Sequence, residues 1–445
     1  MRFLINMNKT FFKNQLHLRP ALLIFCCIFI MTGLNAIFNS IAFSLGYGYP
    51  YASFLFDPSD RFADYFKVIF SLPGASDLQI GGSSLLRGYL DNNSYGGVKA
   101  LTDGTLTNLH LPPLVTLIAL SNLKLMHFIS PWYVFCAIFF SGAVLIYALV
   151  KKIARSTLDS VLLFASLLLC YPTLFMITRG HIYSGMIALA LSIFLLCAYQ
   201  NNKRFLAILL FAIAVNLKPN AIIFIFALGL PGLKNIKMDV LVFACLATCV
   251  GVTSYLLANA AWPDYTLENW LKAVSIYHDI YVVHNAGLAY GSSLFGPLKI
   301  LFGYSKFIEI VPLALACLII IFGTIQFHTK KISKSSYIFI LCASYVYGSA
   351  VFADYHLLIF ITPLICLYME SGISPYNTHR PIFFSDPSII FVSSILLLTP
   401  KCYMYKGNAS DQVLLNPLIL VAACLFITAF RKKISKISTE RQTIL

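Results

Sequence analysis

Long apolar stretches, separated by short polar or basic connections, form the dominant pattern along this chain. A helix needs about 20 apolar residues to cross the hydrocarbon core of a bilayer, and the first stretch, from Ala21 to Leu45, is long enough. Eleven further stretches follow, some of them shorter than a full crossing. They cover residues 131–150, 158–178, 182–199, 204–217, 219–233, 238–260, 307–327, 337–353, 355–370, 387–400 and 413–430. The pattern predicts an all-α polytopic membrane protein, a bundle of about 11–12 transmembrane helices.

The segments between these stretches predict a single membrane domain over residues 1–445. Its parts are a first helix at 21–45, an outer loop at 46–130, helices at 131–260, an outer loop at 261–306, helices at 307–430 and a basic cytoplasmic tail at 431–445. Within the first loop, Pro112 to Phe128 is apolar enough to span the membrane, but a span there would place Lys151 and Arg155 outside. We therefore predict an interfacial or re-entrant helix.

Composition and charge favour a membrane protein over one that binds nucleic acid. Hydrophobic residues make up 59% of the chain and charged residues only 11%, with a mean hydropathy of +0.80, far from a soluble domain. The net charge of +15 arises from Lys and Arg clusters between apolar stretches, which is a topology signal. The clusters are Lys151, Lys152 and Arg155; Lys203 and Arg204; Lys234 and Lys237; Lys330, Lys331 and Lys334; and Arg431, Lys432, Lys433 and Lys436. Alternating helices place all of them on the cytoplasmic side, so we expect membrane lipids, and no nucleic acid, as partners.

Neither disulfides nor a metal site is indicated. The twelve cysteines lie almost all inside apolar stretches and lack the spacing of a disulfide framework or a zinc site, so we interpret them as packing residues. The acids and histidines also lack a recognisable metal-ligand spacing. We expect no metal and no cofactor.

The predicted topology gathers unusual polar residues at the outer face. They come from widely separated parts of the chain: Asp57, Asp60, Asp64, Arg179, His181, Lys218, His278, His284, Asn285, Asp354 and His356. Ionisable groups at membrane depth are costly and usually functional. Their collection at one level predicts a site.

Three acids follow the first helix, and Asp60 and Asp64 would share one face of a helix at their i, i+4 spacing. A carboxylate beside aromatic residues at a membrane surface can act as a general base. The alternative is structural: Asp60 caps a helix, and Asp64 pairs with Arg61 or Lys67.

Two short basic motifs interrupt apolar pairs at the same face. Arg179-Gly180-His181 leaves no room for a long loop, and a cation fixed there can hold a phosphate. Lys218-Pro219 would offer a second phosphate partner within reach of a lipid headgroup. For both motifs the alternative is a basic side chain that simply extends to the interface.

The second outer loop, 261–306, mixes aromatic, amide and hydroxyl side chains. They are Trp262, Trp270, Tyr277, His278, Tyr281, His284, Asn285, Tyr290 and Ser293. Such a mixture suits a sugar, whose faces stack on rings and whose hydroxyls need directional partners. An interfacial aromatic belt has a similar composition.

Five short motifs occur along the chain in a characteristic order. They are the acidic segment after the first helix, Pro112-Pro113-Leu114, the helix from Arg179-Gly180-His181 to Tyr199, the Leu217-Lys218-Pro219 break, and the stretch from His284-Asn285 to Ser293-Leu294-Phe295-Gly296. In order and spacing, over residues 20–370, they resemble glycosyltransferase family 87 of the GT-C superfamily. That family contains polyprenol-phosphate-mannose-dependent mannosyltransferases. The chain departs from the family pattern at His181, where many members have a small polar residue.

The resemblance implies a GT-C-like fold and an inverting transfer of a mannose-like hexose from a polyprenyl-phosphate donor to a lipid or polysaccharide acceptor. It assigns the catalytic base to Asp64 or Asp60, with Asp57 a weaker candidate, and both choices stay open. Cations that stabilise the departing phosphate map onto Arg179, His181 and Lys218. Residues expected to bind the sugar or the acceptor are Asp57, His284, Asn285, Ser293 and His356.

Two other functions compete with this prediction. A transporter or flippase of a lipid-linked glycan would also have many spans, but transporters usually carry internal repeats and midplane polar sites. A serotype-type surface-polysaccharide glucosyltransferase would share the lipid-linked donor. The lipid-donor chemistry favours a bacterial inner membrane, with the site facing the periplasm.

Overall fold

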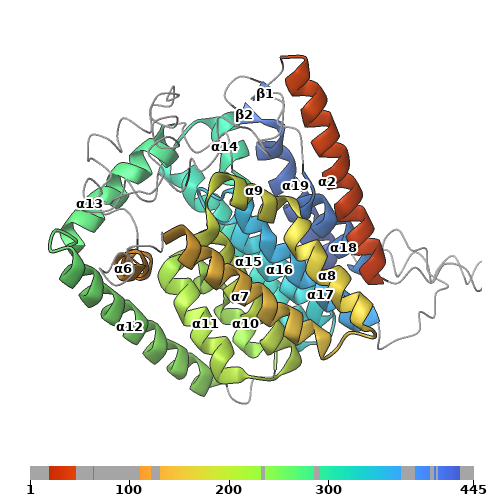
Figure 1. The fold of residues 1–445 in the computed structure, drawn as a ribbon, viewed down its shortest axis with the longest axis horizontal. Helices are drawn as coiled ribbons and strands as arrows, with labels where there is room; N and C mark the ends of the chain where they lie inside the picture. Colours follow the sequence, from red (N-terminus) through yellow and green to blue (C-terminus); the bar gives the residue numbers. More distant parts are fainter. Residues whose placement is uncertain are drawn as a thin grey trace, which may run out of the picture.

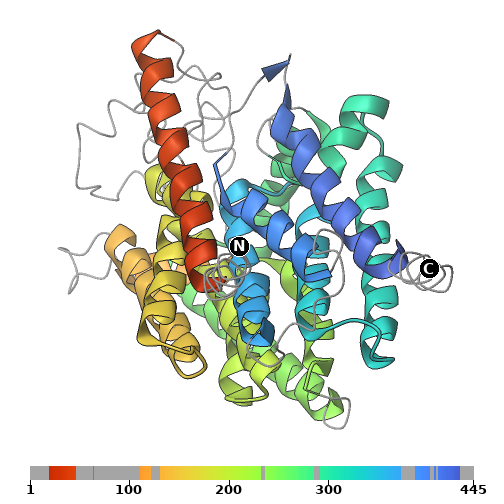
Figure 2. The same ribbon diagram turned by 90° about the vertical axis from the view of Figure 1, so that its right-hand side faces the viewer.

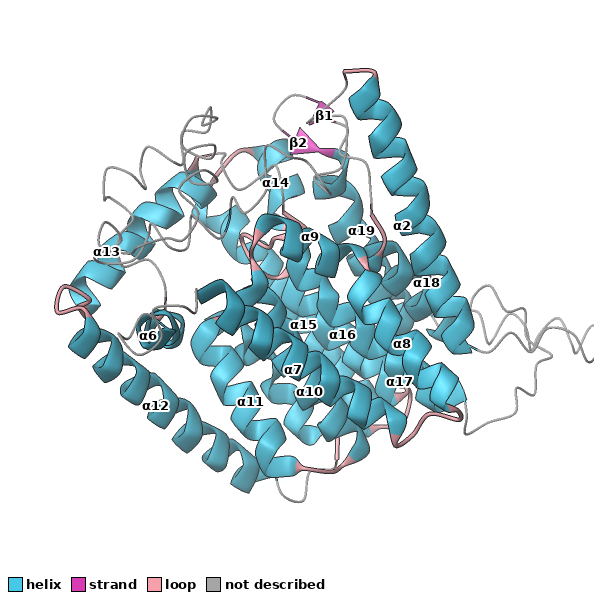
Figure 3. Cartoon of the chain, in the orientation of Figure 1, coloured by secondary structure: helices cyan, strands magenta, loops and turns pink. Residues whose placement is uncertain are grey.

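A computed structural model of the protein describes residues 20–46, 64, 111–121, 131–231, 236–284, 291–371, 386–400, 405–406 and 409–430. Nearly all of these residues are helical, and the helices pack side by side into a bundle (Figures 1 and 3). Strands β1 (Tyr405–Lys406) and β2 (Ala409–Ser410) form a small antiparallel pair at one end. The predicted all-α class is confirmed. Most of the first outer loop and the basic tail lie outside the described residues.

The described helices follow the predicted apolar stretches closely. They are α2 (Pro20–Ser44), α6 (Pro112–Ser121), α7 (Pro131–Lys151), α8 (Thr157–Leu169), α9 (Tyr171–Arg179), α10 (Ile182–Gln200), α11 (Arg204–Leu217), η4 (Pro219–Gly229), α12 (Ile236–Ala261), α13 (Leu267–His278), η6 (Asp279–Val283), α14 (Phe295–Phe302), α15 (Lys306–His328), α16 (Lys334–Tyr347), η8 (Asp354–Phe360), α17 (Ile361–Ser371), α18 (Asp386–Leu398), α19 (Asp411–Leu425) and η10 (Phe426–Phe430). Each of the twelve predicted stretches therefore contains a helix.

Five of the described helices are long and apolar enough to cross a membrane. They cover Pro20–Ala42, Trp132–Lys151, Ile182–Gln200, Ile236–Ala261 and Lys306–His328. Their outward faces are apolar: Leu34 on α2, Leu256 on α12 and Leu318 on α15 are each more than half exposed. Such contiguous exposed apolar surface is stable in lipid and not in water. The chain is a polytopic membrane protein.

Helix breaks have clear local causes. The predicted span 158–178 is two helices, α8 and α9, which meet at a 44° bend and count as a sixth crossing if taken together. Cys170 is extended there because Pro172, in the first turn of α9, cannot continue the hydrogen bonding of α8. The break at Lys218-Pro219 is confirmed. Lys218 is extended (φ −152°, ψ 96°), as the residue before a proline prefers, and a 3₁₀ helix follows it.

Helix α10 lies at the centre of the bundle and α2 at its edge (Figures 1 and 2). Nearly all of α10 is buried against α7, α11 and η8. Helix α6 packs on α12, where the Thr116 hydroxyl donates to the Ser254 carbonyl at 2.6 Å. At about 1.5 Å per residue, α6 as described reaches only roughly half the hydrocarbon thickness. Residues 122–128 of the predicted interfacial helix lie outside the described residues.

The packing around α10 gives a test of the fold. A side chain at Gly185 would meet the ring of Phe139 at 2.9 Å and the sulfur of Met176 more closely still. We expect Gly185→Val to destabilise the protein by about 1–3 kcal/mol through overpacking. Gly33→Val on α2 is the matched control, because a side chain added there meets nothing within 4 Å. Thermal unfolding in detergent measures both, and equal melting temperatures for the two variants would contradict the packing described.

Candidate functional site

One end of the bundle collects polar side chains from distant parts of the chain. Helices α10 and α11 are joined by only three residues, Asn201 to Lys203, so they run antiparallel, and the start of α10 lies at the same end as the close of α11. The segment before α14 joins them there, because the Ser292 amide donates to the Phe352 carbonyl at 2.8 Å and Gly291 bridges Ala353. In Figure 1 this is the upper end, where α9, α14 and the β-strands lie.

An ion pair between Asp64 and Arg179 is the central contact of this end. The Arg179 Nε donates to Asp64 Oδ2 at 2.6 Å, and its Nη2 donates to Oδ1 at 3.0 Å. Both side chains are largely buried. Arg179 is the last residue of α9, which ends because Gly180 adopts the left-handed conformation (φ 76°). The guanidinium also lies over the Phe175 ring, 5.6 Å from its centroid.

Tyrosines from three elements surround this pair. Asp64 interacts electrostatically with Tyr183 on α10, Tyr277 on α13 and Tyr355 on η8. Burial, followed by Tyr281 and Asp64, raises the pKa of Tyr277, so its hydroxyl stays protonated and can donate. Tyr277 stacks on Tyr281 at 4.4 Å between ring centroids. Rings and hydroxyls beside a carboxylate are typical of sugar-binding sites in general.

Two histidines meet beside the tyrosines through a shared hydroxyl. The Ser184 Oγ lies 2.6 Å from His181 Nδ1 and 3.3 Å from His356 Nε2, and Ser184 is fully buried. The ring of His181 stacks on Tyr355 with centroids 4.1 Å apart. The predicted site residues His181 and His356 are therefore neighbours. Ser184 was not predicted as a site residue, because the only indication of such a role in the sequence is its position three residues after His181.

Lys218 lies beyond His356 at the break between α11 and η4. Its ammonium is 4.4 Å from the centroid of Phe352 and 5.7 Å from that of Tyr345. Lys218 and His181 both interact electrostatically with His356. Asp64, Arg179, His181, Lys218 and His356 therefore form one continuous group, which we call the polar cluster.

Asp354 has a structural role next to the polar cluster. Its buried carboxylate accepts from the Ser292 hydroxyl at 2.5 Å and from the Tyr171 hydroxyl at 3.5 Å. The Asn416 amide in turn donates to Ser292 at 2.9 Å. These bonds connect η8 to α9, α19 and the segment before α14.

The structure does not bring every predicted residue into the polar cluster. His284 is exposed and faces Asp279 at 3.6 Å, and the Ser293 hydroxyl donates to the Ala350 carbonyl at 3.0 Å. Ser293 lines a small separate pocket with Tyr281, Phe295 and Val351. Asp57, Asp60 and Asn285 lie outside the described residues.

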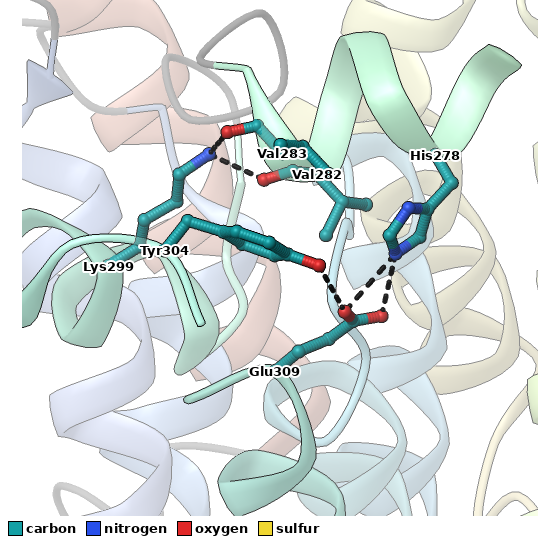
Figure 4. A network of polar contacts seen from close by, with 6 residues as sticks. All are labelled: His278, Val282, Val283, Lys299, Tyr304 and Glu309. Carbon is teal, nitrogen blue, oxygen red and sulfur yellow. Dashed lines mark hydrogen bonds and ion pairs between the residues drawn. The ribbon is translucent and has the colours of Figure 1, made fainter. Parts of the chain in front are cut away.

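His278 belongs to a second network, which joins α13, η6, α14 and α15 (Figure 4). Its Nε2 lies 3.0 Å from the Glu309 carboxylate, which also accepts from the Tyr304 hydroxyl at 3.2 Å. The buried Lys299 ammonium donates to the carbonyls of Val282, Val283 and His284. These carbonyls end the helical segment that carries Tyr277, so Lys299 holds that segment against α14.

Within the described ranges, no group of three or more His, Cys, Asp or Glu side chains could hold a metal ion. Comparisons with models of protein families, with curated proteins and with solved structures found no match. The resemblance to family 87 therefore stays a prediction.

The Lys299 contacts predict how the outer segment responds to substitution. Lys299→Met keeps the length of the side chain but removes three hydrogen bonds, each worth about 1 kcal/mol or more when the donor is charged. We expect backbone amides of 279–284 to exchange hydrogen roughly a hundredfold faster, because the loss of three bonds makes local opening easier. Lys306→Met, at the exposed start of α15, is the control. Unchanged exchange in Lys299→Met would show that the clamp does not hold the segment.

Proposed function

We propose that this protein is a membrane glycosyltransferase that moves a hexose from a polyprenyl-phosphate donor to a lipid or glycan acceptor. The observation that carries the proposal is the carboxylate of Asp64, fixed by Arg179 and surrounded by tyrosines at one end of a lipid-embedded bundle. A fixed carboxylate beside aromatic hydroxyls suits deprotonation of a sugar hydroxyl. The end of a bundle is also where the headgroup of a lipid-linked substrate lies.

The reaction is a single inverting displacement at the anomeric carbon. Asp64 takes the proton of the acceptor hydroxyl as its oxygen attacks the anomeric carbon. The bond between that carbon and the phosphate oxygen breaks, and its electron pair leaves with the polyprenyl phosphate. No oxidation or reduction occurs, and the proton ends on the Asp64 carboxylate.

Arg179 prepares Asp64 for this step. A guanidinium partner keeps a carboxylate ionised, which is the form that accepts a proton. Each carboxylate oxygen has two acceptor positions, and Arg179 occupies one on each oxygen. The fixed orientation supplies the positional accuracy that proton transfer needs.

The finer assignment is a GT-C-like arrangement of about 11–12 helices, with the polar cluster on the periplasmic face of a bacterial inner membrane. The described basic residues support this orientation. Lys151, Arg204, Lys237 and Lys334 lie at helix ends opposite to the polar cluster, where the positive-inside rule places the cytoplasm. The site at one end of the bundle supports a transferase over a transporter, whose substrate site lies near the midplane.

Replacement of the base tests the proposal. We expect Asp64→Asn to lower the rate of sugar transfer by roughly 10²- to 10⁴-fold, the contribution of a positioned general base. Asparagine keeps the size of the side chain and one acceptor for Arg179, so the protein remains folded. Transfer is measured with purified protein, radiolabelled polyprenyl-phosphate hexoses and a membrane-lipid extract.

Asp239→Asn is the matched control, because Asp239 pairs with Arg204 at the opposite end of the bundle. It should transfer sugar at the wild-type rate. Asp60→Asn is assayed alongside. Full activity in Asp64→Asn, together with loss in Asp60→Asn, would move the base to Asp60.

A further inference from the structure

Helix α13 connects the ends of two membrane spans. Residues 262–266 separate its first residue, Leu267, from Ala261, the last residue of α12. At its other end, His278 Nε2 lies 3.0 Å from the carboxylate of Glu309, in the first turn of α15. Both α12 and α15 are long and apolar enough to cross a membrane. Since both ends of α13 are held where a span ends, the helix lies along the membrane surface.

A tight turn sets the direction in which α13 leaves α12. The Thr266 hydroxyl caps the helix and accepts from the Asn269 amide at 3.2 Å, and the Asn269 side chain donates to the Asp264 carbonyl at 2.8 Å. Tyr265 is buried, and its backbone amide donates to the Trp262 carbonyl at 2.9 Å. The helix therefore starts in a defined direction and lies at the periphery of the bundle (Figure 1).

One face of α13 packs against the bundle. Ala273 is buried, and Trp270 packs against the hydrophobic core. Tyr277 stacks on Tyr281 and interacts electrostatically with Asp64. Trp270, Ala273 and Tyr277 lie on the same side of the helix, because their spacing is i, i+3 and i+7. The position of α13 therefore decides where Tyr277 lies relative to Asp64.

A second face of α13 is apolar but exposed. Leu267, Leu271 and Val274 form a stripe at i, i+4 and i+7, and the two leucines are each more than half exposed. Glu268 and Lys272 are also exposed, on a different side of the helix. An exposed apolar stripe beside a charged face is typical of a helix that lies in the membrane–water interface.

The apolar stripe continues the lipid-facing surface of the two spans that α13 connects. Leu256, near the end of α12, is 61% exposed, and Phe307 and Ile310, at the start of α15, are 76% and 59% exposed. Lipid covers these residues because they belong to membrane-spanning helices. The same lipid monolayer is therefore the surface next to Leu267 and Leu271.

We propose that α13 binds the lipid monolayer on the side of the polar cluster through Leu267, Leu271 and Val274, and that this contact holds Tyr277 beside Asp64. The charges of Glu268 and Lys272 cancel, so the attraction comes from the acyl chains of the lipids and does not need anionic headgroups. Since α13 lies in the interface, Tyr277 and Asp64 lie at the level of the headgroups.

Photo-crosslinking identifies what covers the apolar stripe. The photoreactive residue p-benzoylphenylalanine replaces Leu271, Lys272 or, as a positive control, Leu256 in the full-length protein in phosphatidylcholine nanodiscs. We expect adducts with phospholipid acyl chains at Leu271 and Leu256, detected by mass spectrometry, and a several-fold lower yield at Lys272. Addition of phosphatidylglycerol should leave the yield at Leu271 unchanged.

Three results would overturn the membrane contact as proposed. Lipid adducts at Leu256 but not at Leu271 would show that lipid does not cover α13. A product of doubled mass at Leu271 would assign the apolar stripe to a second copy of the chain. A yield at Leu271 that rises with phosphatidylglycerol would show that headgroup charge, and not the acyl chains, supplies the attraction.

Hydrogen exchange in nanodiscs tests whether the contact holds the segment that carries Tyr277. Leu271→Asn and Lys272→Asn place the same residue on the apolar face and on the charged face, and neither leaves a cavity because both side chains are exposed. We expect the backbone amides of 274–283 to exchange about five- to tenfold faster in Leu271→Asn, because lipid buries roughly the half of Leu271 that the protein leaves exposed.

Lys272→Asn should exchange at nearly the wild-type rate. Equal rates in the two variants would show that the lipid contact does not hold α13. Neither the crosslinking nor the exchange measurement involves sugar transfer, so both test the membrane contact whether or not the protein transfers a hexose.

Discussion

The bidentate pair of Asp64 and Arg179 satisfies a constraint that shapes the whole upper end of the molecule. A charged side chain at the edge of a bilayer is costly unless an opposite charge or a polar partner meets it. Arg179 is held at the close of α9 by the turn at Gly180, and α9 itself is set apart from α8 by the bend at Cys170. The pair fixes one carboxylate among tyrosines, and the rest of the polar cluster is arranged around it.

Both ends of the bundle hold buried polar side chains. At the end opposite to the polar cluster, Arg204 pairs with Asp239, and Glu370 accepts from the amide and hydroxyl of Ser335. These contacts join the ends of neighbouring helices. At the upper end, Tyr345 and His356 keep unpartnered atoms beside the Lys218 ammonium. Buried atoms without a partner also occur at the opposite end, in Asp159, Asn202 and Arg204, so the polar cluster is distinguished by its charged and aromatic neighbours.

Sequence patterns predicted the helices, the break at Lys218 and the five residues that form the polar cluster. Apolar length and basic connections are local signals, so they can be read from the chain alone. The bend at Cys170 was also visible in Pro172 but was overlooked. The pairing of Asp64 with Arg179 joins residues that are 115 positions apart, and no local pattern selects that partner. Ser184 was missed because a buried hydroxyl in an apolar helix looks like a packing residue until its neighbours are known.

His284 and Ser293 were predicted as site residues from their residue types, and the structure places neither in the polar cluster. Their residue types suit a sugar site, but His284 is exposed and the Ser293 hydroxyl bonds to the Ala350 backbone.

The central claim, that the polar cluster works on a lipid-phosphate sugar, is tested most directly by the choice of donor. Purified wild-type protein in nanodiscs is given the same radiolabelled hexose as a polyprenyl phosphate or as a nucleotide diphosphate, with a membrane-lipid extract as acceptor. We expect transfer from the polyprenyl phosphate alone. Transfer from the nucleotide sugar alone, or from neither donor, would contradict it.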